Sequence, residues 1–236
     1  MYMEINLVTY THSSCKDIIN VHNNLAEKYL SPTNHYIFSD YEVDDNRVQS
    51  YIYYDNEPYS EHYVKLLKNI NADFFIYHQE DHLLYNKVDI KKINIYLEFL
   101  KNNPEYSFVR LLRSGNTHSY KLMDTLFSIE TDSDQIFSMQ PTIWKKEDLI
   151  KIYEYETVNR IRDEAQFKNA CKNLNIKGAF HFDNESRRGQ NHFDSNIYPC
   201  ICTALIRGKW NISEYTKELF DIFNEYSIMY NTREYI

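Results

Sequence analysis

Glycine is scarce in this sequence, with only four residues in 236 positions: Gly115, Gly178, Gly189 and Gly208. None has the spacing of a dinucleotide-binding loop or of a P-loop, so NAD-dependent chemistry and P-loop kinase activity are disfavoured. There is also no Gly-x-Ser-x-Gly segment, which forms the turn that carries the nucleophile in many serine hydrolases, so that class is disfavoured as well. The chemistry must therefore lie in other residue types.

Cysteines and long apolar runs are also few. The four cysteines are too few and too scattered for a disulfide framework, so we expect reduced, buried thiols. No apolar stretch approaches the roughly 20 residues that span a bilayer, and the first residues do not have the pattern of a secretory signal. We expect a soluble, cytoplasmic protein without a membrane span.

Positive charge is in deficit, because the formal net charge is −8. Binding to the phosphates of nucleic acids needs clustered Lys and Arg, so we expect no nucleic-acid partner. An anionic substrate must then meet a local positive site. The apolar content of 43% is ample for a large core.

Strand-like and helix-like periodicities alternate along the chain, and no linker or repeat interrupts them. This pattern predicts one α/β domain over residues 1–236, with a nucleotide-binding half (1–88) and an acceptor or lid half (89–236). Strands are expected at 4–10, 35–40, 48–54, 73–78, 106–113 and 176–182, and helices after residue 13 and at 58–70, 89–102, 145–155, 158–174 and 213–226.

The segment from Ala72 to Tyr85 is the most informative part of the chain. An apolar run there ends in adjacent carboxylates, Glu80 and Asp81, flanked by His78 and His82. Open α/β sheets bind ligands beyond the carboxyl ends of such strands, and desolvated acids there favour a divalent cation. The alternative is a solvated turn, but no Gly, Pro or Asn is present to form one. We therefore interpret the segment as a metal site.

Several segments, in this order, resemble GT-A-type, nucleotide-sugar-dependent glycosyltransferases of bacterial and viral polysaccharide biosynthesis. They are Val8–Thr11, Tyr77–His82, Ser138–Trp144, the pair Asp163-Glu164, Glu185–Gly189, His192–Ser195 and Ile206–Trp210. The resemblance implies a GT-A-like single domain with a mixed, mostly parallel central sheet flanked by helices. It also implies transfer of a sugar from a nucleoside diphosphate sugar to a glycan or other hydroxyl acceptor, with Mn²⁺ or Mg²⁺ as cofactor.

The resemblance assigns roles to individual residues. In an inverting mechanism Glu164 is the candidate base that takes the acceptor proton, and Asp163 is the second candidate. The metal candidates are Glu80, Asp81, His82 and His192. The candidates for binding the nucleotide sugar are Thr9, Tyr10, Thr11, Asp40, Gln140, Arg187 and Arg188.

One feature departs from the common Asp-x-Asp metal motif, because the two acids are adjacent. In an extended chain they would point to opposite sides, so we expect only one of them to bind the ion directly. Glu80 and His82 would share a side.

Simpler interpretations stay open. The arginine-rich segment is also typical of a solvated turn, the Asp163-Glu164 pair of an exposed first helical turn, and the early polar residues of strand-end caps. A metal-dependent nucleotidyl- or phosphotransferase would need a second carboxylate pair, which is not evident. A non-catalytic interaction module would need neither metal nor nucleotide.

Overall fold

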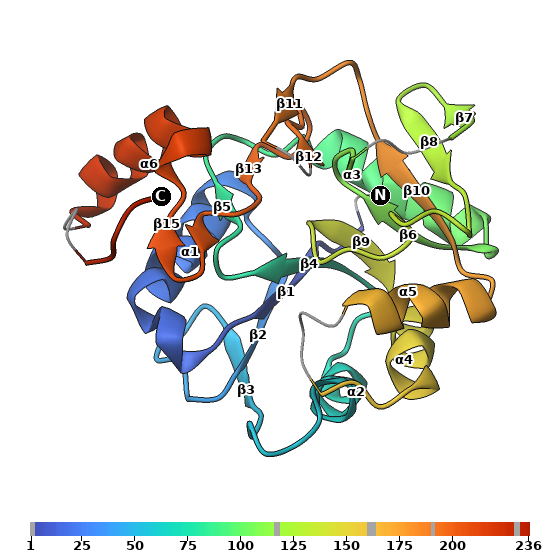
Figure 1. Ribbon diagram of the computed structural model, residues 1–236, viewed down its shortest axis with the longest axis horizontal. Coiled ribbons are helices and arrows are strands. Elements are labelled where there is room, and N and C mark those ends of the chain that lie inside the picture. Colours follow the sequence, from blue (N-terminus) through green and yellow to red (C-terminus); the bar gives the residue numbers. More distant parts are fainter. Residues whose placement is uncertain (1–2, 116–118, 160–163, 190–191, 229–231) are drawn as a thin grey trace.

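A mixed, mostly parallel sheet forms the centre of the protein, as the sequence predicts (Figure 1). The computed structural model describes residues 3–115, 119–159, 164–189, 192–228 and 232–236. Within these residues nine strands make the sheet. In spatial order they are β3 (Gln49–Ile52), β2 (Asn34–Ser39), β1 (Asn6–Tyr10), β4 (Phe74–Gln79), β9 (Thr142–Lys145), β6 (Tyr106–Arg110), β10 (Lys177–His181), β8 (Leu126–Ile129) and β7 (Lys121–Met123).

Helices cover both faces of this sheet. On one face pack α1 (Lys16–Tyr29), which follows the short 3-10 turn η1 (Ser13–Cys15), α3 (Ile90–Asn102) and α6 (Ile212–Tyr226). On the other face lie α2 (Tyr59–Asn69), α4 (Lys146–Tyr155) and α5 (Glu164–Asn173), which run together beneath the sheet in Figure 1. Two layers of helix around a sheet bury both of its faces, which explains the continuous apolar runs of the central strands.

Alternation along each strand divides the core in two. Leu7 and Ile76 face the α1 side, whereas their neighbours Val8 and Tyr77 face the α2 side. The same period of two places Trp144 on the α2 side, where its ring lies 4.4 Å from that of Phe108. Trp144 is therefore a core residue and not a platform for a sugar.

One of the four glycines is required by close packing. Gly178 in β10 lies beneath the ring of Phe108 on β6, and a Cβ at this position would come within 2.0 Å of that ring. The pairing of β10 with β6 shifts register at the same place. Only a residue without a side chain allows the two strands to approach here.

The predicted helices are confirmed at α3, where Asp89 caps the amino terminus by accepting from the Lys92 amide, and at α4 and α6. The predicted strand at 106–113 is shorter than expected and ends at Arg110. The strand β9 was not predicted. It runs antiparallel between β4 and β6 and leads directly into α4.

Three short two-stranded sheets complete the fold in the described residues. They are β5 (Leu83–Leu84) with β13 (Cys200–Ile201), β11 (Arg187–Arg188) with β12 (His192–Phe193), and β14 (Leu205–Ile206) with β15 (Lys209–Trp210). The carboxyl-terminal segment returns to α1 through an ion pair between Arg233 and Asp17. None of the helices in the described ranges combines the length and the apolar character that crossing a membrane requires.

Candidate active site

Strand order brings distant segments together at one edge of the sheet. Parallel strands β4 and β6 end at this edge, and the antiparallel β9 begins there. Thr142, the first residue of β9, lies opposite both Tyr77 of β4 and Arg110 of β6. Gln140, just before β9, is therefore held beside the residues that follow β4 and β6.

A cavity of about 370 Å³ opens at this edge. Its wall includes residues that follow β4 and β6, the segment before β9, the first turns of α5 and the loop after β13. The lining residues are Gln79, His82, Gly115, Gln135, Phe137, Ser138, Met139, Gln140, Glu164, Lys168, His192, Cys202 and Thr203. Four predicted site residues, His82, Gln140, Glu164 and His192, thus meet at one cavity.

Glu80 and Asp81 form a turn, which corrects the extended geometry that we expected. The His82 amide donates to the Gln79 carbonyl at 3.0 Å, so the two acids occupy the middle of a four-residue turn. The argument that they point to opposite sides of an extended strand is therefore wrong. The turn is nevertheless partly buried rather than fully solvated.

Burial makes this pair of acids electrostatically unusual. It raises the pKa of Glu80, and burial together with the neighbouring Glu80 raises the pKa of Asp81 to about 8. The Leu205 amide donates to Asp81 Oδ2 at 3.4 Å. Across the part of the chain that the structure describes, neither carboxylate has a Lys, Arg or His partner within 4.0 Å. A cation at the turn would favour the ionised form of both groups.

His82 lies next to this turn and lines the cavity. Its Nδ1 accepts the Gln79 amide at 3.1 Å, and burial lowers the pKa of His82 to about 3. The ring is therefore neutral at pH 7, and because Nδ1 is an acceptor the ring proton is on Nε2. This geometry makes His82 a donor toward the cavity, whereas we expected a metal ligand.

Glu164 and Lys168 reach the cavity from the first two turns of α5. The Lys168 ammonium lies 3.9 Å from the Glu164 carboxylate, as residues four apart on a helix allow. Asp163, the second predicted catalytic acid, lies outside the described residues.

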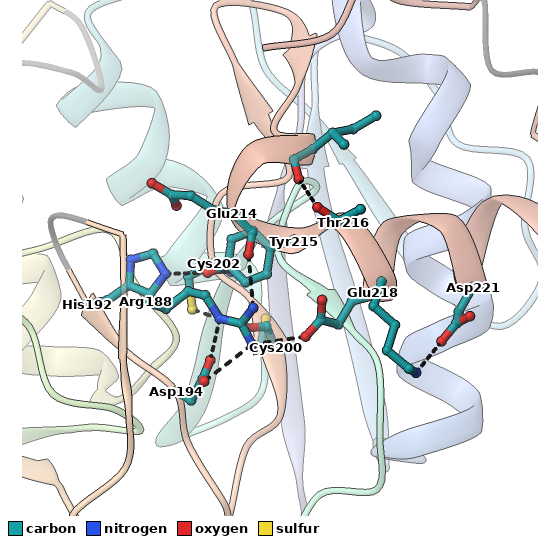
Figure 2. A network of polar contacts seen from close by, with 12 residues as sticks. Arg188, His192, Asp194, Cys200, Cys202, Glu214, Tyr215, Thr216, Glu218 and Asp221 are labelled. Carbon is teal, nitrogen blue, oxygen red and sulfur yellow. Dashed lines mark hydrogen bonds and ion pairs between the residues drawn. The ribbon is translucent and has the colours of Figure 1, made fainter.

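The guanidinium of Arg188 is held by acidic and aromatic side chains of the same chain (Figure 2). Its Nε donates to Asp194 at 3.0 Å and its Nη2 to Glu218 at 2.9 Å, while the guanidinium lies 5.0 Å from the ring centre of Tyr215. The Tyr215 hydroxyl in turn hydrogen-bonds Nε2 of His192. These contacts tie the loop after β10 to α6 and position His192, which is a different task from the phosphate contact we expected of Arg188. Arg187 is exposed on β11.

The carboxyl ends of β1 and β2 form a second polar region. Asp40 accepts the Ser13 amide at 2.6 Å and lies 3.6 Å from His12, which also hydrogen-bonds the exposed Asp55 at 3.2 Å. One ligand atom from each of His12, Asp40 and Asp55 lies within 4.8 Å of the others, so the three could hold an ion together. The Glu80 side chain also lies on this side, close to the Cys15 thiol.

The predicted nucleotide contacts on β1 differ in accessibility. Tyr10 is partly exposed, and its ring stacks on Tyr53 at 5.0 Å. Thr11 is buried, and its carbonyl accepts the Tyr53 hydroxyl at 2.9 Å. Thr9 is fully buried and hydrogen-bonds His35 at 2.9 Å, so its side chain serves the core.

Sequence reasoning missed several lining residues, namely Lys168, Gln135, Thr203 and Cys202. For Lys168 a signal existed, since it lies one helical turn after Glu164. Thr203 and Cys202 reach the cavity only because β13 pairs with β5, a contact between residues more than 100 positions apart. His12 and Asp55 each follow an early strand, as does the predicted Asp40.

No family model and no curated protein matches this sequence. Among solved structures, S. aureus TarS aligns with a TM-score of 0.50 and 13% identity over 96% of this chain and 39% of that chain. A CMP:2-keto-3-deoxy-manno-octonic acid synthetase complexed with CTP aligns with a TM-score of 0.47 and 10% identity, over 74% of this chain and 88% of that chain. The bifunctional IspDF of Campylobacter jejuni aligns with a TM-score of 0.46 and 14% identity, over 78% of this chain and 50% of that chain.

At these identities the likeness concerns the fold alone. This chain spans less than half of the length of TarS, which aligns with nearly all of it. The strand order together with that alignment establishes a GT-A-like α/β fold.

Proposed function

We propose that this chain is a metal-dependent glycosyltransferase that moves a sugar from a nucleoside diphosphate sugar to a glycan or other hydroxyl acceptor, with inversion. One observation carries the proposal. The desolvated acids of the Glu80–Asp81 turn have no ion pair in the described residues and lie beside a cavity that Glu164 also lines. This combination supports a site for an anionic leaving group next to a base.

The turn suits a hard divalent cation. Glu80 and Asp81 offer carboxylate oxygens, which Mg²⁺ and Mn²⁺ prefer. Burial raises the pKa of both acids, and the neighbouring Glu80 adds to the rise at Asp81. These two residues would hold the ion, while His82 donates from beside it. When bound, such an ion stabilises the negative charge of the departing diphosphate.

Glu164 performs the proton transfer in this proposal. Its carboxylate takes the proton from the acceptor hydroxyl as that oxygen bonds to the anomeric carbon, and the bond from that carbon to the diphosphate oxygen breaks. The diphosphate leaves with the bonding electron pair. The Lys168 ammonium lies 3.9 Å from this carboxylate. Asp163 stays the second candidate for this role.

The nucleoside binds beyond the acid turn, toward β1 and β2. Asp40 and the partly exposed Tyr10 are the residues that we assign to base and ribose there, since Tyr10 ends β1 and Asp40 follows β2 at the carboxyl ends of these parallel strands. His192 completes the cavity on the other side. Its orientation is set by Tyr215, on whose ring Arg188 packs.

Thermal unfolding with and without ligands tests this proposal. Mn²⁺ together with the correct nucleoside diphosphate should stabilise the protein by roughly 2.7 kcal/mol at a hundredfold excess over Kd. Asp81→Asn removes the charge but keeps an oxygen for the Leu205 amide, so this variant should fold and lose the metal response.

Turnover of the matching nucleotide sugar supplies the second measurement. Glu164→Gln should reduce turnover on the order of 10²- to 10⁴-fold, with donor affinity changed much less. Absence of stabilisation by every nucleoside diphosphate would refute the proposal. Release of pyrophosphate from a nucleoside triphosphate would identify a nucleotidyltransferase instead.

A further inference from the structure

Arg110 is buried directly behind the cavity, at the end of β6, with 1% of its surface exposed. Its Nη1 donates to Ser114 Oγ at 3.0 Å and its Nη2 to the Gln135 carbonyl at 2.9 Å. A guanidinium can only donate hydrogen bonds. Ser114 Oγ is therefore an acceptor toward Arg110 and must pass its own proton to another group.

Gln140 receives that proton. Ser114 Oγ donates to Gln140 Oε1, which commits the oxygen end of the amide. In the opposite amide orientation the Gln140 nitrogen would face Ser114 Oγ, which already accepts from Arg110. The NH₂ end makes no hydrogen bond to the described residues, and the side chain lines the cavity. The buried arginine thus fixes Gln140 as a donor toward whatever the cavity holds.

Two further lining residues, His82 and Lys168, present donors. His82 presents Nε2–H because its Nδ1 accepts the Gln79 amide at 3.1 Å. Lys168 adds an ammonium, and Glu164 is the only acid among the described lining residues. The cavity therefore combines two donors of fixed direction with the positive charges of Lys168 and the buried Arg110, against the single carboxylate of Glu164.

We propose that this cavity recognises a sugar that carries a carboxylate, with Gln140 and His82 donating to its oxygens. A sugar hydroxyl both donates and accepts, so fixed donors discriminate weakly among neutral sugars, whereas a carboxylate only accepts. Hydrogen bonds to an ionised acceptor are also the stronger ones. The inference rests on the proposed function, and the carboxylate can belong to the donor sugar or to the acceptor.

Binding measurements in the presence of Mn²⁺ test this inference in two arms. Once the preferred nucleoside diphosphate is found, the donor arm compares its glucose, N-acetylglucosamine and glucuronate derivatives by calorimetry. The acceptor arm titrates methyl glucoside and methyl glucuronide into protein saturated with the nucleoside diphosphate. We expect the glucuronate ligand to bind on the order of tenfold tighter in one arm.

Variants then distinguish the hydrogen bonds that link Arg110, Ser114 and Gln140 from a simple effect of charge in the cavity. Gln140→Glu should abolish the preference for glucuronate, and Ser114→Ala should weaken it because the amide can turn over. Gln135→Glu is the matched control, since it adds the same charge to the same cavity wall while its carbonyl bond to Arg110 remains. This control should keep most of the preference.

Three results would overturn the inference. They are equal binding of glucose and glucuronate ligands in both arms, a preference for the acetamido sugar, or an equal loss of nucleoside diphosphate binding itself in Gln140→Glu. Each of them leaves the proposed function standing, because the nucleoside diphosphate still binds the unaltered protein. Failure of every nucleoside diphosphate to bind would overturn both proposals.

Discussion

Lowering the pH from 7 to 5 should strongly destabilise this protein, because several buried histidines, including His22, His35, His78 and His82, carry no charge. His22 Nε2 lies 3.1 Å from His78 Nδ1, and His78 Nε2 lies 2.7 Å from the Tyr198 hydroxyl. Burial lowers the pKa of His22 to about 4 and of His82 to about 3, and places that of His35 and His78 well below the usual range. All four are neutral in the folded state at pH 5.

The sign follows from the unfolded chain, in which each histidine binds a proton near pH 6.5. The stabilisation that the neutral rings provide is complete above that pH and is lost as the pH falls toward the folded pKa values. Between pH 7 and pH 5 each ring costs a little less than about 2 kcal/mol, which amounts to about 7.5 kcal/mol for the four together. Asp81, whose pKa is raised to about 8, takes up its proton in the folded state at a higher pH than in the unfolded chain. Over the same pH range this stabilises the folded state by roughly 2 to 3 kcal/mol.

The net loss of about 5 kcal/mol is a large part of a typical free energy of unfolding. Urea titrations at pH 7, 6 and 5 in EDTA, at constant ionic strength, measure it through the fluorescence of the buried Trp144 and Trp210. His78→Gln removes one titrating ring and should reduce the slope with pH. His12→Gln, which removes a substantially exposed histidine, is the comparison variant. A free energy that differs by less than about 1 kcal/mol between pH 7 and pH 5 would refute the reasoning.

Three further outcomes are expected. Gly178→Ala should destabilise the fold by about 1 to 3 kcal/mol in urea titrations, because its methyl group would overlap the Phe108 ring; an unchanged midpoint would contradict the packing. Binding of Mn²⁺ at pH 7 should release close to one proton, since Asp81 is mostly protonated beforehand. Calorimetry in two buffers of different ionisation enthalpy measures the number of protons released, and a value of zero would contradict the prediction. Arg188→Lys should lower kcat by disturbing His192 while the Kd for the nucleoside diphosphate changes little; a large loss of affinity would instead assign Arg188 to the phosphates.

The sequence predicts those elements whose signal is local. The helix α3 has both a capping Asp89 and an apolar period of 3.6, and the structure confirms it almost to the residue. The strand β4 is a continuous apolar run, as expected for a strand covered on both faces. In such segments propensity, pattern and tertiary environment agree, so the chain needs no distant information to define them.

Elements that depend on distant partners were not predicted. The strand β9 is only four residues long, and it forms because β4 and β6 offer it two open edges. Its neighbourhood resembles the start of α4, which in fact follows at once. The same limit applies to the loop around Thr203, whose place beside His82 depends on the pairing of β13 with β5.

The candidate site shows both outcomes. The acids beyond β4 were located from the sequence, but their local geometry was predicted wrongly. The segment from Ala72 to Tyr85 contains no Gly, Pro or Asn that would indicate the turn. Glu164, Gln140 and His192 were chosen separately, and the structure brings all three to one cavity. Arg188 shows what sequence cannot provide, since only the fold reveals that Asp194 and Glu218 already engage it.

The neutral histidines also explain why the acid turn suits a cation from solution. His78 and His82 flank Glu80 and Asp81 in the chain, and a protonated ring beside a carboxylate would neutralise it within the protein. Burial prevents that, because it lowers the pKa of both rings while raising that of both acids. The negative charge can then be balanced by a divalent ion, whose binding at pH 7 competes with a proton on Asp81. Acidification should therefore weaken metal binding and the fold over the same pH range, the first by protonating the acids and the second by favouring the protonated histidines of the unfolded chain.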